Sequence, residues 1–166
     1  RRMTDRYMQH VVADSDRQAI YALALARGDV DVLRAMVAPE ESRAFDLDAL
    51  IHRLERDYAS VHADRARLHD DPSLFIREYL KAEVRRSGTL VRQLNQQAVT
   101  VLRQRLSDAE KQTEPIETRC QDESWVQWVL DLTESLLWLD EKETWHWLTP
   151  RFVEGLAYNA DLCRGL

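Results

Sequence analysis

The sequence predicts an all-α fold, an irregular stack of seven to eight antiparallel helices forming an α-solenoid segment or a helical bundle. Apolar residues recur at the three- and four-residue steps of amphipathic helices, and no segment shows the apolar–polar alternation of a strand. The 166 residues include only four glycines and four prolines, too few for the many turns of a β-sandwich or barrel. We expect one all-helical domain over residues 1–166, as a fragment of a longer chain, with a candidate sub-boundary in the polar loop 108–122.

The first helices are defined by their capping residues. A short helix is expected over residues 7–13, and Asp14 or Ser15 then caps a second helix. Gly28 ends this second helix, since glycine readily adopts the left-handed conformation that follows helix C-termini. Asp29 caps a third helix that ends before the next proline, so the sequence predicts a helical hairpin here.

The middle of the chain predicts three longer helices. One begins at Asp46 and covers residues 46–68, because its apolar residues follow the alternating four- and three-residue steps of a heptad. The next begins at Asp71-Pro72, since proline is favoured at the first helical position, and ends at Ser87-Gly88. A further helix then extends to Leu106.

The last part of the chain follows the polar loop 108–122. An apolar helix is expected over Glu123–Leu139, and a short one over residues 141–148. Thr149-Pro150 then resembles a capping residue followed by proline, so we expect it to begin a separate last helix.

The charge distribution argues against a general nucleic-acid or membrane binder. The net charge is −6, whereas such surfaces need a basic footprint. No apolar run approaches the length of a membrane span, so we expect no membrane partner. The alternative function is a regulatory nucleic-acid-binding helical module using the Arg-rich helix 85–105, which holds five arginines and no acid: Arg85, Arg86, Arg92, Arg103 and Arg105.

No pattern in the sequence indicates catalysis. Phosphate-binding and nucleophile motifs are absent, so we expect no enzyme activity, no cofactor and no small-molecule substrate. Cys120 and Cys163 lie in no metal-binding or redox motif and are expected to be free thiols. His62 and His69 are seven residues apart, about 10 Å along a helix, which is too far for one metal ion, so no metal is expected.

All five tryptophans lie between residues 125 and 147. A helical wheel places Trp125 and Trp128 on a buried side and Trp138 on a polar stripe with Glu134. The next two tryptophans are two residues apart, so one of them should point outward. Either all five pack inside a helical layer or some contact a partner protein, and the residues assigned to that protein interface are Trp138, Trp145, Trp147, Glu134 and Phe152.

Several segments resemble an α-solenoid scaffold nucleoporin of the nuclear-pore Y-complex, in the C-terminal region of its stem member. They are residues 7–11 (YMQHV), 21–25 (YALAL), 46–51 (DLDALI), 136–139 (LLWL) and the apolar helix over 152–166. The resemblance implies a scaffold role in the nuclear pore, without catalysis or a cofactor. It also implies another α-solenoid nucleoporin as partner, docked on the C-terminal helices.

The sequence therefore predicts a non-catalytic helical scaffold or adaptor that binds another protein, with the nuclear-pore scaffold as its most concrete form. We expect an intracellular protein. The nuclear envelope is its location if the resemblance holds, and the cytoplasm or nucleus otherwise.

Overall fold

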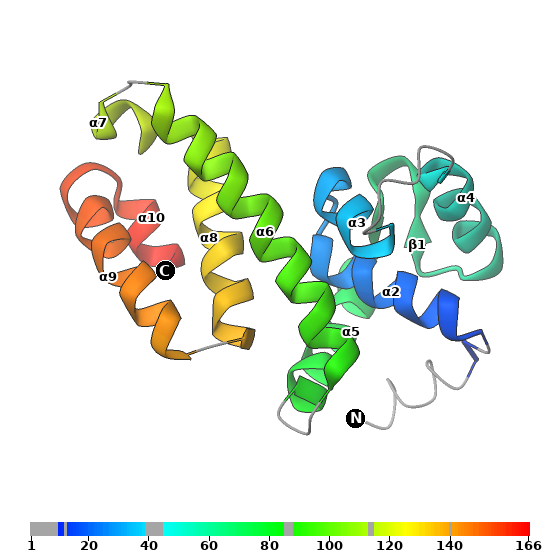
Figure 1. Ribbon diagram of the computed structural model, residues 1–166. Helices are drawn as coiled ribbons and strands as arrows, with labels where there is room; N and C mark the ends of the chain where they lie inside the picture. The colour runs from blue at the N-terminus through cyan, green and yellow to red at the C-terminus, as the bar shows by residue number, and fades with distance from the viewer. Residues whose placement is uncertain (1–9, 12, 39–44, 85–87, 113–114, 140) are drawn as a thin grey trace. The chain divides into compact units, whose positions relative to one another are not determined.

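The computed structural model is all-α, as the sequence predicts (Figure 1). It describes residues 10–11, 13–38, 45–84, 88–112, 115–139 and 141–166. The chain forms two compact units, Arg1–Gln97 and Ala98–Leu166, and the division falls within helix α6 (Thr89–Lys111). Within the described ranges, no helix combines the length and the apolar character that crossing a membrane requires.

The first unit begins with the predicted helical hairpin, α2 (Asp14–Ala26) and α3 (Val30–Val37). The turn between them has two left-handed residues, Arg27 with φ 55° and Gly28 with φ 92°. The Asp29 carboxylate accepts hydrogen bonds from the first backbone N–H groups of α3, so its predicted role as the cap is confirmed.

The start of α2 differs from the prediction in its capping. The residue at the N-cap position is Ala13, which offers no side-chain acceptor, and Asp14 already lies inside the helix. Acidic side chains in this first turn favour the positive end of the helix dipole instead of capping it. The helix expected over residues 7–13 lies mostly outside the described residues.

The long helix predicted over residues 46–68 is wrong beyond Asp57. Asp46 does cap α4 (Leu47–Asp57), by accepting a hydrogen bond from the N–H of Ala49, but the chain then leaves the helix. It forms a small antiparallel hairpin, in which β1 (Val61–His62) pairs with β2 (Arg67–Leu68) around the 3-10 helix η1 (Ala63–Arg65).

The heptad spacing led to a wrong prediction here, because apolar spacing indicates which residues are buried but does not by itself identify a helix. Val61 and Leu68 pair directly across the hairpin and are both almost fully buried. They would also have shared a face of one helix, so the apolar spacing fits both structures. The left-handed Ala66 makes the reversal that the pattern did not indicate.

Helix α2 is the centre of the first unit's core. It packs against α3, strand β2 and α5 (Asp70–Val84), whose first turn holds the predicted helix-starting proline. An ion pair ties α2 to α4, because the Asp16 carboxylate accepts hydrogen bonds from Arg53 Nη2 at 2.7 Å and from the Tyr58 hydroxyl at 3.0 Å. The largest core side chains of the unit are Ile20, Leu23, Leu33, Met36, Leu47, Leu54, Leu68, Ile76, Leu80 and Leu94.

The second unit contains the predicted helix α8 (Glu123–Leu139), followed by α9 (Glu141–Tyr158) and α10 (Ala160–Gly165). The separate helices expected over 141–148 and from Thr149 onward form one continuous helix, with Pro150 in its interior. The Thr149 hydroxyl donates to the carbonyl oxygen of Trp145 at 2.9 Å, so it serves the helix it belongs to and does not cap a new one.

The polar segment 108–122 is partly helical. It holds the end of α6 and the short helix α7 (Ile116–Arg119), and Cys120 at its end is buried. Burial raises the pKa of the Cys120 thiol, and Cys120 and Cys163 are both free cysteines, as expected.

Candidate functional site

Helix α9 presents a row of exposed apolar side chains. Trp145, Phe152 and Leu156 are 59%, 41% and 68% exposed, and their spacing of seven and four residues places them on one side of the helix. Val153, 59% exposed, lies beside this row. We call these four residues the α9 stripe, which extends about 16 Å along the helix. Contiguous exposed apolar side chains are typical of binding surfaces.

Arg151 fixes the other side of α9 to the rest of the unit. Its side chain is 13% exposed and donates to the carboxylates of Glu110 at 2.5 Å and Glu154 at 2.7 Å. Its guanidinium group also lies over the rings of Trp125 and Trp147, 5.5 Å and 4.8 Å from their centroids. A cation that is paired and stacked in this way anchors the helix, and so orients the α9 stripe away from the core.

The tryptophans predicted for the interface divide between surface and core. Trp145 is exposed, as expected for one of the pair at 145 and 147. Trp147 is half-buried, and its indole N–H donates to the hydroxyl of Thr133 at 3.0 Å. Trp138 is only 9% exposed, so of the alternatives for this residue the structure shows the buried one.

The remaining predicted positions also separate by exposure. Phe152 lies on the α9 stripe together with Trp145, whereas Glu134 is half-buried on α8. Trp125 is buried as predicted, and Trp128 is half-buried with the Arg105 guanidinium 5.7 Å from its ring centroid. An interface role for the exposed pair stays a prediction.

Val153 and Leu156 were missed as surface residues because Pro150 was taken to begin a new helix. If residues 141–148 and the residues from Thr149 onward were separate helices, the sequence would not determine how Trp145 lies relative to Phe152 and Leu156. One continuous helix places Trp145, Phe152 and Leu156 on the same side, so the signal was the seven-and-four spacing across the proline.

The arginines assigned to the alternative nucleic-acid surface are partly engaged inside the second unit. Arg103 is ion-paired with Glu143 of α9, and Arg105 stacks on Trp128. Arg85 and Arg86 lie outside the described residues. A guanidinium group already paired with a carboxylate contributes little to phosphate binding, so these contacts do not favour the nucleic-acid alternative.

No protein-family model, curated protein or solved structure matches this chain. The resemblance to a scaffold nucleoporin therefore stays a prediction, and a function must be inferred from the chain's own surface chemistry.

Proposed function

We propose that this chain is a non-catalytic helical scaffold or adaptor that binds another protein through the α9 stripe. The observation that carries the proposal is the exposure of Trp145, Phe152 and Leu156 on one side of an anchored helix. Aromatic side chains of this kind each bury a large area on association and act as anchors in protein interfaces. Burying the stripe would remove from water the largest continuous apolar row on α9.

The occupant that fits the stripe best is an amphipathic helix of the partner. The stripe is narrow and follows the ridge of one helix, which is the geometry that packs into the groove of another. The unit that carries the stripe is acidic, because residues 98–166 hold thirteen acids and seven bases, a net charge of 7 − 13 = −6. Charge complementarity therefore favours a partner helix with basic residues flanking its apolar side.

A competition between designed peptides tests this surface. The probe is a fluorescein-labelled amphipathic helical peptide with lysine flanks, compared with the same peptide carrying glutamate flanks, and binding is measured by fluorescence anisotropy. We expect the lysine peptide to bind more tightly, and the double variant Trp145→Ala/Leu156→Ala to bind it at least about tenfold more weakly.

Leu74→Ala is the matched control, because Leu74 is 58% exposed in the first unit and resembles Leu156 in exposure. It should bind the peptide as the unaltered chain does. Equal binding by the double variant would refute the α9 stripe as the docking surface. A collapse of its thermal stability would instead assign these side chains to the core.

The nuclear-pore scaffold is the most concrete setting we propose for such a module. Its support is the resemblance of the segments named above to a stem nucleoporin of the Y-complex. In that setting the partner is another α-solenoid nucleoporin and the location is the nuclear envelope. Fluorescence microscopy of the tagged protein in its own cells tests this setting, since a diffuse signal without a nuclear rim would contradict it.

A further inference from the structure

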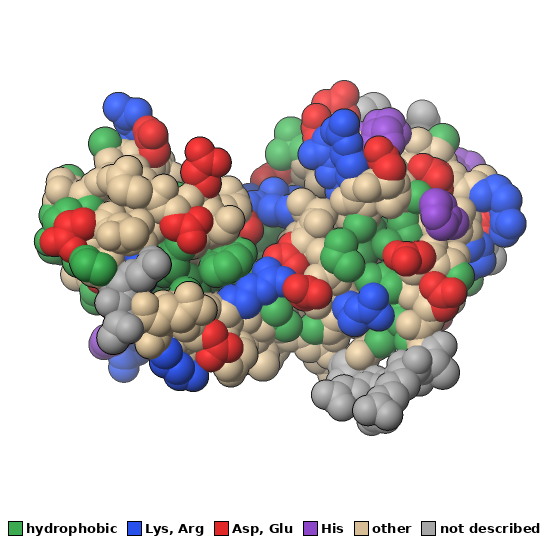
Figure 2. Space-filling view, turned by 90° about the horizontal axis from the view of Figure 1, so that it is seen from above, with side chains coloured by type: hydrophobic (Ala, Val, Ile, Leu, Met, Phe, Trp, Pro, Cys, Tyr) green, Lys and Arg blue, Asp and Glu red, His purple; other side chains and the backbone are tan. Residues whose placement is uncertain are grey.

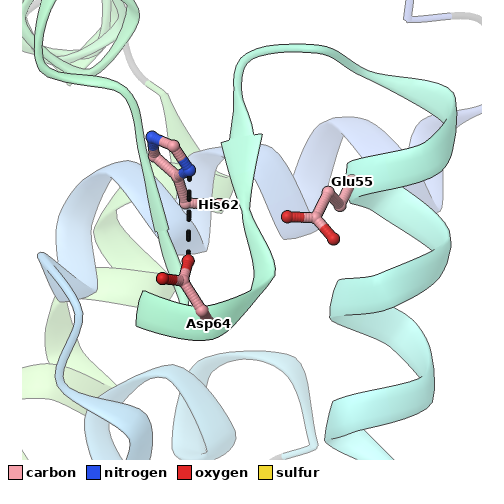
Figure 3. A group of neighbouring side chains, drawn as sticks. All are labelled: Glu55, His62 and Asp64. Carbon is pink, nitrogen blue, oxygen red and sulfur yellow. Dashed lines mark ion pairs between the residues drawn. The ribbon is translucent and has the colours of Figure 1, made fainter.

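The hairpin of the first unit brings together three side chains of metal-binding type. Glu55 comes from α4, His62 from β1 and Asp64 from η1, and one ligand atom of each lies within 4.8 Å of the other two. Figure 3 shows Glu55 extending from α4 toward the hairpin that carries the other two residues. In Figure 2, histidine and acidic side chains lie beside one another on the surface formed by residues 1–97, on the right.

A backbone contact holds Glu55 in place, and Asp64 lies near two charged or polar side chains. The backbone N–H of Ala63 donates to Glu55 Oε1 at 2.9 Å, which fixes the end of α4 against the hairpin. Asp64 Oδ2 lies 3.7 Å from Arg65 Nε, while its Oδ1 lies 4.0 Å from His62 Nδ1. The carboxylate of Asp64 therefore presents one oxygen to the imidazole and the other to a neighbouring cation.

These separations suit an ion better than direct contacts among the three side chains. At 4.0 Å, His62 Nδ1 and Asp64 Oδ1 are too far apart for a hydrogen bond. Two carboxylates close together repel each other, and a divalent cation between them removes that repulsion. With Zn²⁺ bonds of about 2.0–2.2 Å, tetrahedral ligands lie roughly 3.4 Å apart. Because Glu55 and Asp64 are exposed, their side chains have room to rotate inward to that spacing.

The sequence argument against a metal used the wrong geometry and the wrong residues. It placed His62 and His69 about 10 Å apart on one helix, but their ring centroids are 3.5 Å apart across the hairpin. Glu55 was not considered, and on a continuous helix it would have lain about 10 Å from His62 and on the opposite face from Asp64. The break after Asp57 is what brings the three groups together.

We propose that Glu55, His62 and Asp64 bind one Zn²⁺ ion, with water in the fourth position. One imidazole nitrogen and two carboxylate oxygens are donors that zinc accepts, and three protein ligands with an open position is a known zinc arrangement. The ion would connect α4 to strand β1 and to the 3-10 helix η1 that follows it. It would therefore stabilise the first unit, since ligands of separate elements come together only in the folded chain.

The test is a calorimetric titration of the full chain with ZnCl2 after chelator treatment and dialysis, with the melting temperature measured in parallel. We expect one Zn²⁺ per chain, a higher melting temperature with Zn²⁺, and no comparable effect of MgCl2. His62→Gln and Glu55→Gln should each weaken Zn²⁺ affinity at least about tenfold. Glu55→Gln retains an oxygen for the Ala63 N–H, so its hairpin should still form.

His146→Gln is the matched control, because His146 is exposed on the second unit and far from these ligands in sequence. It should bind Zn²⁺ as the unaltered chain does. Asp64→Asn, at a side chain that is 72% exposed, replaces either variant that does not fold. Absence of Zn²⁺ binding, or unchanged affinity in the three ligand variants, would overturn the proposal.

Discussion

The two compact units complete their cores to different extents. Among the described residues, three large apolar side chains are exposed in residues 1–97, one on α3 and two on α5, whereas in residues 98–166 five of six lie on α9. Among the described residues, those of the first unit are Val30, Leu74 and Phe75, and those of the second are Leu137, Trp145, Phe152, Val153, Leu156 and Tyr158. A helical unit that leaves one side of a helix uncovered retains a surface for another helix.

The polar contacts of the two units also serve different purposes: those of the first unit join helices of its core, and those of the second anchor helix α9. The first unit ties α2 to α4 through Asp16, whose side chain is 9% exposed and bound by Arg53 and Tyr58. The second unit places Arg151 between aromatic rings and carboxylates on the inner side of α9. The Asp16 contacts join α2 to α4 within the core of the first unit. The Arg151 contacts anchor α9, while its outer side stays exposed to solvent.

The largest expected effect contrasts two tryptophans of the second unit. Trp125 is 1% exposed, so Trp125→Ala should lower the free energy of unfolding by about 3–5 kcal/mol. Trp145→Ala should change it by no more than about 0.5 kcal/mol, because Trp145 is 59% exposed. Urea unfolding followed by circular dichroism measures both. Equal losses would remove the distinction between the core and the α9 stripe.

A smaller effect is expected at the ion pair of the first unit. The hydrogen bond from Arg53 is the main cause that lowers the pKa of the Asp16 carboxyl below its ordinary value. Asp16→Asn should cost about 1–2 kcal/mol, a modest value because the Arg53 side chain is 39% exposed to screening solvent.

The pH dependence of this effect follows from the direction of the shift. A lowered pKa in the folded chain stabilises it above the unfolded pKa of about 3.9, and this stabilisation is lost as the pH falls through the folded value. Urea midpoints between pH 7 and pH 2 should therefore fall more for the unaltered chain than for Asp16→Asn. Parallel curves would show that Asp16 does not contribute.

The smallest expected effect concerns the inner side of α9. Thr133→Val removes the hydroxyl that accepts the indole N–H of Trp147, and should cost about 1 kcal/mol. Trp147→Phe removes the donor of the same bond. A double-mutant cycle with urea unfolding should show coupling between the two substitutions. Strict additivity would mean that this bond does not help to orient the helix.

The sequence was sufficient for elements whose signals are local. Asp29 and Asp46 were identified as caps because a capping carboxylate acts on N–H groups two or three residues away. Helix Glu123–Leu139 was predicted with its observed bounds, because its apolar character is strong over its whole length.

The rest depended on contacts distant in sequence. The apolar residues Val61 and Leu68 fit a helix or a hairpin equally well, and only their packing against the core distinguishes the two. Pro150 usually indicates a helix start, yet here it lies within a helix that tertiary contacts of Arg151 hold together. The α9 stripe and the proposed Zn²⁺ site both lie where these local signals gave a wrong prediction, at Pro150 and after Asp57.

Pro150 also gives the α9 stripe a direction. Proline has no backbone N–H, so it cannot donate to the carbonyl oxygen of His146 four residues earlier, as other helical residues would. Residue 146 lies one helical step from Trp145 and on the same side of the helix as Val153, seven residues later. A purely apolar row would accept a partner in either orientation or in several registers. One polar acceptor beside it would select the alignment in which the partner supplies a donor at that point.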